Sequence, residues 1–125
     1  MHVVLVVPGG VDRGGVERVI PAILSLVERL ALDHRVTVVA LGQEPVACTY
    51  ELLGATVVNV PPERHGAHRL ARQVARAVRA IGSQGRPDVI HALWASVTGL
   101  CAVVAGRRFN GAIYRNHLRT QPSPA

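Results

Sequence analysis

The chain contains no lysine, although it has 125 residues and a formal net charge of +6. Its 14 strongly basic residues are therefore all arginines. A catalytic lysine and the lysine of a P-loop are excluded, because no residue could supply either. Arginine stays charged and donates paired hydrogen bonds to phosphate or carboxylate, so the composition favours an anionic ligand or partner.

Aromatic side chains are almost as scarce, at 3% of the residues, whereas hydrophobic residues make up 49%. The core must therefore be built from Val, Leu, Ile and Ala. This composition suits a sheet covered by helices on both faces better than a β-sandwich. The length is that of one ordinary domain and allows a sizeable core.

Cysteines and long apolar runs are also few. Cys48 and Cys101 lie far apart with no C-x-x-C spacing, so neither a zinc site nor a disulfide framework is indicated. No apolar run approaches the roughly 18 residues that would span a bilayer. The N-terminus lacks the basic region and cleavage site of a signal peptide. We expect a cytoplasmic protein with reduced thiols.

What the sequence does contain is an alternation of strand and helix patterns. Short runs rich in Val, Ile and Ala predict strands, and apolar residues at spacings of three and four predict helices. The predicted strands cover residues 3–7, 35–41, 55–60, 89–93 and 112–117. The predicted helices cover residues 16–30, 46–53, 68–81 and 95–105.

For two of these helices the sequence also predicts how one end is formed. Pro21 lies inside the first, so either the turn up to Ile20 is irregular or the helix kinks at the proline. The short helix over 46–53 is expected to end at Gly54, which would occupy the C′ position where glycine often terminates a helix.

Strands and helices that alternate in this way form right-handed crossovers. The sequence therefore predicts a Rossmann-like, doubly wound α/β fold with a mainly parallel, five-stranded sheet and helices on both faces. We expect one domain over residues 1–119 and a flexible, Pro-rich tail over 120–125.

A glycine-rich turn, Pro8 to Gly15, follows the first strand. Glycines let a backbone approach a ligand closely, and the N–H groups at the start of a following helix bind anions. Neither G-x-G-x-x-G nor the Walker pattern is present. We expect a phosphate-bearing ligand at this turn, with Arg13 neutralising a phosphate. The alternatives are a tight turn without a ligand and a solvated Arg13.

The carboxyl ends of the fourth and fifth predicted strands lie at the same edge of such a sheet. His117 could orient a hydroxyl group there, because histidine donates or accepts at neutral pH. A surface histidine is the alternative. His91 ends a buried strand and fits a structural role, and Trp94 could stack on a sugar or cover the core. No carboxylate cluster lies at this edge, so no catalytic metal is implied.

Four arginines lie on one side of the predicted helix over 68–81, at spacings of three and four: Arg69, Arg72, Arg76 and Arg79. Three interpretations are open. The arginines form a solvated helix face, they contact an anionic membrane, or they bind nucleic acid. Nucleic acid is the least favoured, because no stacking aromatics accompany them.

Four motifs in order resemble the N-terminal domain of GT-B glycosyltransferases, most closely the family 4-like retaining enzymes. The motifs are GGVER at 14–18, HRVTVVAL at 34–41, PDVIHALWAS at 87–96, and the strand that ends at His117. The family pattern is GG-x-E-R, then GH-x-V-x-V-x-T, then PD-[VI]-[VI]-H-x-H. The resemblance covers almost the whole chain up to about His117.

The resemblance implies roles for several residues. Gly14 and Gly15 would approach the diphosphate of a nucleotide sugar, and Arg13 lies in the same turn. His117 would lie by the sugar and the acceptor, as a tentative catalytic residue. The acceptor side would also include His91, Trp94 and Asn116. The nucleotide sugar would be a co-substrate, with no further cofactor, and the acceptor a hydroxyl group.

The sequence also departs from the family pattern. The donor domain with its E-x7-E pair is absent, and Leu93 occupies the position of the second histidine after the fourth strand. We expect the front part of an enzyme, as an isolated domain or a truncated product, that is inactive alone. It would pair with a donor domain or with itself, and could lie on the inner face of a membrane.

A hypothesis from another class is a non-catalytic Rossmann-like module that binds a nucleotide, a partner chain or an anionic surface. Because GT-B folds also include sugar-nucleotide epimerases, the reaction class rests on analogy.

Overall fold

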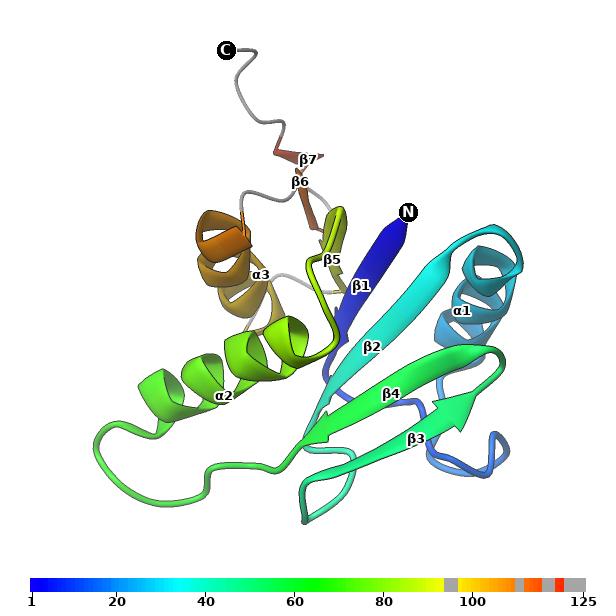
Figure 1. The fold of residues 1–125 in the computed structure, drawn as a ribbon. Coiled ribbons are helices and arrows are strands. Elements are labelled where there is room, and N and C mark those ends of the chain that lie inside the picture. Colours follow the sequence, from blue (N-terminus) through cyan, green and yellow to red (C-terminus); the bar gives the residue numbers. More distant parts are fainter. Residues whose placement is uncertain (94–96, 110–111, 116–118, 121–125) are drawn as a thin grey trace, which may run out of the picture.

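The structure is a computed structural model that describes residues 1–93, 97–109, 112–115 and 119–120. Its strands are β1 (His2–Val7), β2 (Arg35–Leu41), β3 (Cys48–Leu52), β4 (Ala55–Val60), β5 (Val89–Ala92), β6 (Ala112–Arg115) and β7 (Arg119–Thr120). Its helices are α1 (Pro21–Asp33), α2 (Arg69–Ser83) and α3 (Val97–Phe109). The described strands form one sheet in the order β3-β4-β2-β1-β5-β6-β7 (Figure 1).

The predicted Rossmann-like fold is confirmed. The five predicted strands, β1, β2, β4, β5 and β6, pair in parallel. Every residue of β1 is buried, as expected for a parallel strand that is covered on both faces. The sheet is larger than predicted, because β3 and β7 pair antiparallel at its two edges.

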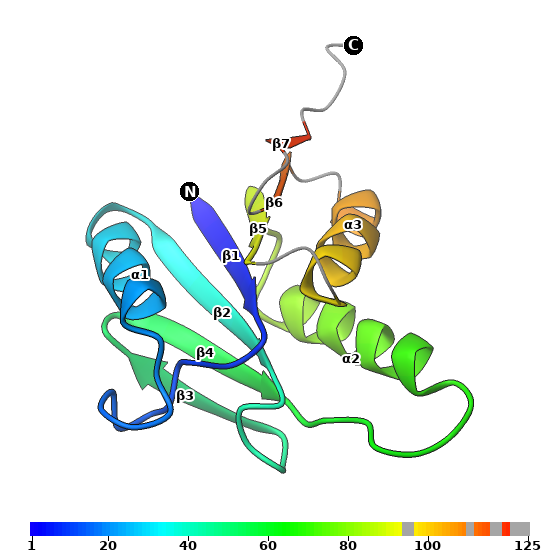
Figure 2. The same cartoon turned by 180° about the vertical axis from the view of Figure 1, so that it is seen from behind.

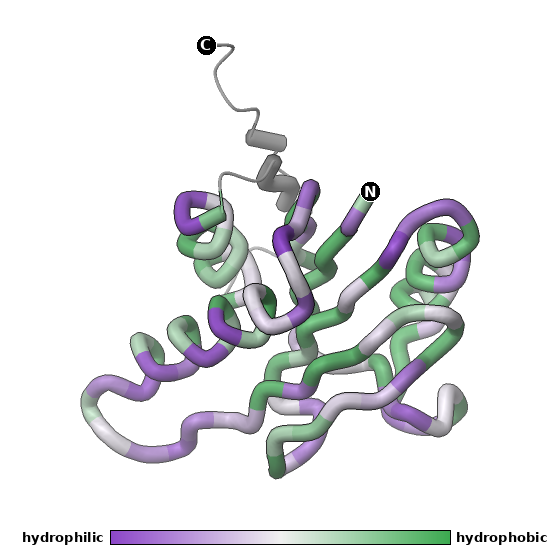
Figure 3. Tube along the Cα trace, in the orientation of Figure 1, coloured by the Kyte–Doolittle hydropathy of each residue, from purple (hydrophilic) through white to green (hydrophobic). Residues whose placement is uncertain are grey.

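Alternate residues of each central strand point to opposite faces of the sheet, which creates two cores. Leu5 and Val38 pack with α1 on one face. Val6 and Val39 pack with α2 and α3 on the other face. Figures 1 and 2 show α1 on one side of the sheet and the other two helices opposite. In Figure 3 the central strands β1 and β2 are mostly green, the colour of hydrophobic residues.

The helix predicted over 46–53 is wrong, because β3 occupies this segment and forms a hairpin with β4. Leu53 and Gly54 make its two-residue turn, and both have positive φ, at 51° and 85°. Gly54 therefore closes a hairpin rather than a helix. Within β3, Tyr50 is less exposed than Thr49 and Glu51. This period of two is typical of a strand, but it extends over only five residues.

α1 begins at Pro21, so the first of the two alternatives for this proline is correct. A proline in the first turn loses no hydrogen bond, since its N–H would have no partner there. The segment before it is an irregular loop, residues 8–20, which we call the glycine loop. Ile20 N–H donates to the carbonyl of Gly10 at 2.9 Å, and Val11 and Val19 form an antiparallel bridge.

The start of α1 contradicts one prediction about the phosphate site. We expected a helix directly behind the glycines, with its N-terminal N–H groups beside Gly14 and Gly15. That expectation is wrong, since five residues, 16–20, lie between Gly15 and the start of α1 at Pro21. Any anion site at Gly14 and Gly15 must therefore use donors of the loop itself.

The last two helices agree with the sequence pattern. α2 matches the helix predicted over 68–81, and α3 covers 97–105 of the next predicted helix and continues to Phe109. Residues 95 and 96 lie outside the described part. Among the described residues, no helix combines the length and the hydrophobicity needed to cross a membrane.

Candidate functional site

The order of the strands reverses between β1 and β5. From β1 the chain continues to β2 and β4 on one side, and it then returns to β5 and β6 on the other side. A doubly wound sheet binds its ligand beyond the carboxyl ends of the strands at such a point. Leu93 N–H donates to the carbonyl of Val6 at 3.0 Å, which holds the end of β5 beside the end of β1.

The glycine loop begins at this point, and its own packing requires glycine. Gly10 has a φ of 81°, and a Cβ atom there would lie 2.7 Å from Ile20 Cγ1. Gly15 has a φ of 70°. Both positions favour glycine, because an L side chain is strained in the left-handed region. Backbone conformation and packing therefore explain the glycines at positions 10 and 15 without a ligand.

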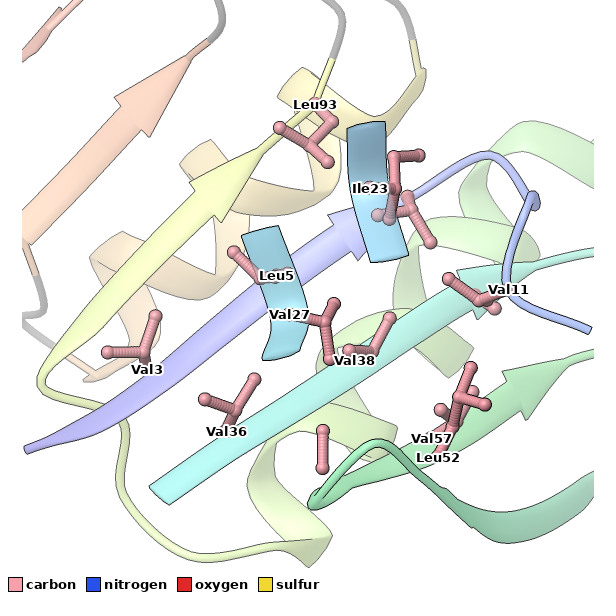
Figure 4. Packing of buried hydrophobic residues seen from close by; sticks show 13 residues of the cluster. Val3, Leu5, Val11, Ile23, Val27, Val36, Val38, Leu52, Val57 and Leu93 are labelled. Carbon is pink, nitrogen blue, oxygen red and sulfur yellow. The ribbon is translucent and has the colours of Figure 1, made fainter. Parts of the chain in front are cut away.

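Val11 fixes the glycine loop to the domain. Its side chain is fully buried in the core beneath α1, where Figure 4 shows it near Ile23. Its N–H donates to Gln43 Oε1 at 3.0 Å, and its carbonyl accepts from the Tyr50 hydroxyl at 2.6 Å. Both polar groups of a buried backbone unit are therefore satisfied by side chains. The loop is therefore held by Gln43, between β2 and β3, and by Tyr50 of β3.

Arg18 links the glycine loop to the loop that follows β2. Arg18 lies in the left-handed region, with a φ of 53°. Its guanidinium donates to Asp12 Oδ1, to Glu44 Oε1 at 2.9 Å and to the carbonyl of Gln43 at 3.3 Å. The hydrogen bond with Glu44 and the charges of Asp12 and Glu44 raise the pKa of Arg18. The ion pairs connect the glycine loop with the loop after β2.

Asp12 also accepts from the predicted phosphate-binding glycines. Gly14 N–H donates to Asp12 Oδ2 at 3.2 Å, and Gly15 N–H donates to the carbonyl of Asp12 at 2.9 Å. An aspartate that bonds the N–H two residues further on forms an Asx turn. Both glycine N–H groups are therefore occupied by one residue of the loop.

Arg13 does not lie over these glycines. Its guanidinium carbon lies 4.9 Å from the centre of the Tyr50 ring, and Nη2 lies 3.7 Å from Cys48 Sγ. It therefore packs on β3 while remaining exposed.

Asn59, at the end of β4, holds the loop that presents Glu44. It is 2% exposed. Its Oδ1 accepts from Glu44 N–H at 3.0 Å, and its Nδ2 donates to the carbonyls of Glu44 at 3.0 Å and Val46 at 2.7 Å. A buried amide that is fully hydrogen-bonded is a rigid support.

The comparison with protein families decides what kind of domain this is. The model of the glycosyl transferase 4-like domain matches residues 14–118, which is most of the chain. The chain belongs to the glycosyltransferase 4-like family. The resemblance seen in the sequence is thereby confirmed. No curated protein matched the chain. Within this glycosyltransferase 4-like domain, the matched span includes Gly14, Arg18, Glu44 and Asn59.

The other predicted site residues of the glycosyltransferase 4-like domain are only partly described. His91 lies in β5, between β1 and β6, and is half-buried. Burial lowers its pKa, so its imidazole is neutral at neutral pH. Trp94, Asn116 and His117 lie outside the described residues.

The four arginines on one side of α2 differ in their contacts. Arg72 and Arg76 both pair with Glu63, at 3.4 Å and 2.8 Å, and Arg72 also donates to the carbonyl of His65. These two arginines fold the 61–68 segment against α2. Arg69 and Arg79 form no ion pair within the described part of the chain.

A groove of about 470 Å³ lies between α2 and β4, on the face opposite α1. β4 is separated from β1 by β2, so this groove is remote from the reversal of strand order. In the described ranges, no three His, Cys, Asp or Glu residues gather as metal ligands would. Both cysteines are free, and burial raises the pKa of Cys101 to about 11, so it is a protonated thiol.

Sequence reasoning missed most of the network around the glycine loop: Asp12, Arg18, Gln43, Tyr50 and Asn59. Two signals were available, since Asp12-x-Gly14 is typical of an Asx turn and Arg18 belongs to the GGVER motif. The others act across loops and leave no local pattern.

Proposed function

We propose that this chain is the N-terminal, acceptor-side domain of a GT-B glycosyltransferase, which transfers a sugar from a nucleotide-sugar donor to a hydroxyl acceptor. The observation that carries the proposal is an ordered glycine loop that leaves the end of β1 at the reversal of strand order and continues through Gly14 and Gly15 to the side of β3. Such a position is where doubly wound sheets bind phosphate-bearing ligands.

In the complete enzyme, charge develops on the diphosphate as it leaves the sugar. Donors fixed in advance lower the barrier, because they need no reorganisation during the reaction. The proposed donors in this chain are the N–H groups of Gly14 and Gly15 and the guanidinium of Arg18. His117 would orient the acceptor, and most of the donor site would come from a second domain.

The test is a protein-observed NMR titration of the chain with UDP, GDP and a UDP-sugar, with uridine as the control that lacks phosphate. We expect phosphate-dependent shifts in the glycine loop and none with uridine. If no resonance of the loop moves at millimolar ligand, the phosphate site is refuted and the non-catalytic module becomes the better hypothesis.

A second measurement concerns activity. We expect the chain alone to release UDP from a UDP-sugar no faster than the uncatalysed background, with or without a hydroxyl acceptor. Turnover by the purified chain would refute the need for a second domain.

The charge distribution supports a further role for the same domain, as a peripheral protein on the inner, anionic face of a membrane. Residues 61–109, which include α2 and α3, contain eight arginines and only two acidic residues. Exposed basic side chains near an anionic membrane gain about 1 kcal/mol each.

A further inference from the structure

The charges of the glycine loop do not suit a phosphate group in their present arrangement. Two carboxylates, Asp12 and Glu44, meet one guanidinium, that of Arg18. The carboxylate side chains are only 15% and 21% exposed, whereas the arginine side chain is 58% exposed. These three side chains together are therefore negatively charged, although the whole chain has a formal net charge of +6.

Asp12 occupies the same donors that a phosphate would need. One carboxylate oxygen accepts from Gly14 N–H at 3.2 Å, and the other accepts from Arg18 Nη2. A phosphate group recognised by this loop would bind the same backbone N–H and the same guanidinium. Gly14 N–H has a single proton to donate, and the Asp12 carboxylate repels a phosphate placed beside it, so the two anions compete for this N–H and for the Arg18 guanidinium.

We propose that Asp12 sets the charge specificity of the glycine loop by competing with a phosphate group for Gly14 N–H and the Arg18 guanidinium. The inference rests on the proposed function, because it assumes a phosphate-bearing ligand at this loop. Binding requires the Asp12 carboxylate to leave both donors. Glu44 keeps Arg18 at the loop while this happens, since it holds the guanidinium from the neighbouring loop at 2.9 Å.

The competing explanation is that Asp12 only shapes the turn. The two explanations separate in Asp12→Asn, because an asparagine side-chain oxygen also accepts from the N–H two residues further on. This substitution keeps the turn and removes the charge. Asp12→Ser is a second variant, since a serine hydroxyl makes the same turn more weakly.

The experiment is an NMR titration of the full 125-residue chain with inorganic pyrophosphate and with UDP, following the Gly14 amide. We expect Asp12→Asn and Asp12→Ser to bind both ligands about fivefold or more tightly than the wild type, as removal of one charge repulsion of about 1 kcal/mol implies. Glu28→Gln is the matched control, because Glu28 is an exposed acid on α1 and the change in net charge is the same.

Each outcome decides the proposal. A gain in both Asp12 variants but not in Glu28→Gln supports it. Equal or weaker binding in the Asp12 variants, with shifts at the glycine loop, overturns the role of Asp12 and leaves the phosphate site in place. An equal gain in Glu28→Gln assigns the effect to net charge and also overturns it. No shift at the loop in any variant overturns the phosphate site and Asp12's role together.

Discussion

At the scale of single residues, the glycines of the loop have different requirements. Gly10 combines a φ of 81° with a Cβ position 2.7 Å from Ile20 Cγ1 and 2.8 Å from Ile20 Cδ1. Gly14 is not in the left-handed region, and its nearest contact would be Asp12 Oδ2 at 3.3 Å. Packing therefore demands glycine at position 10 and not at position 14.

Gly10→Ala should lower the free energy of unfolding by about 2–4 kcal/mol, from backbone strain and overpacking against Ile20. Gly14→Ala is the matched control, with an expected loss below about 1 kcal/mol. Chemical denaturation of both variants measures the difference. Equal losses would show that the loop is not packed as described.

Tyr50 links the glycine loop to β3 through a hydrogen bond from its hydroxyl to the Val11 carbonyl. Burial above all, and then the nearby Cys48, Asp12 and Glu44, raise its pKa from 10.0 to about 12. The folded protein thus holds the phenol proton to higher pH than the unfolded chain does.

The sign of the pH dependence follows from this shift. The stability that Tyr50 contributes is complete below pH 10.0 and is lost as the pH rises towards about 12. In Tyr114→Phe, Tyr50 is the only tyrosine, and its phenolate absorbance should appear with a midpoint well above 10. Tyr50→Phe should remove this part of the pH dependence of unfolding. A midpoint near 10 would contradict the partly buried, hydrogen-bonded hydroxyl.

At the scale of elements, the β3–β4 hairpin contains a residue that does not suit its turn. Leu53 has a φ of 51° and is 43% exposed, so it has backbone strain and little burial to offset it. Asparagine and glycine are the residues that a two-residue turn with positive φ prefers.

Leu53→Asn should therefore raise the free energy of unfolding by about 0.5–1 kcal/mol, because asparagine tolerates the left-handed region. Gly54→Ala is the opposite control. It should destabilise by about 1 kcal/mol or more, since Gly54 has a φ of 85° and a Cβ there would lie 3.3 Å from the Ala31 Cβ. Thermal unfolding of both variants tests the turn, and a Leu53→Asn variant less stable than the wild type would contradict it.

At the scale of the whole molecule, charge is divided between the two halves of the chain. Residues 1–60 contain four arginines and six acidic residues, whereas residues 61–109 contain eight arginines and two acidic residues. α2 and α3, both in the basic half, cover the same face of the sheet (Figure 2). The face opposite α1 is therefore the one that should attract an anionic surface.

Vesicles that contain anionic lipid should bind the chain, whereas neutral vesicles should not. Arg79→Gln should weaken binding about fivefold, because each arginine near an anionic surface contributes about 1 kcal/mol. Arg29→Gln on α1 is the matched control and should change little. Sedimentation with vesicles at rising salt measures both, since screening weakens the attraction. Equal losses in the two variants would refute a specific membrane-facing surface.

The sequence by itself determined the five parallel strands and α2. Strands that are buried on both faces read as runs of Val, Ile and Ala, and an amphipathic helix repeats every three to four residues. These signals are local in the sequence, so they can be recognised without knowledge of the fold. The order of the motifs likewise identifies the family without the structure.

Only the tertiary structure decided where the short and irregular segments lie. Five residues of β3 are too few for periodicity to separate strand from helix, and β4 determines the outcome by pairing with them. The contacts of Val11 with Gln43, and of Arg18 with Glu44, join loops that are distant in sequence. Such contacts depend on which strand ends the sheet brings together, and the spacing of residues along the chain does not encode that.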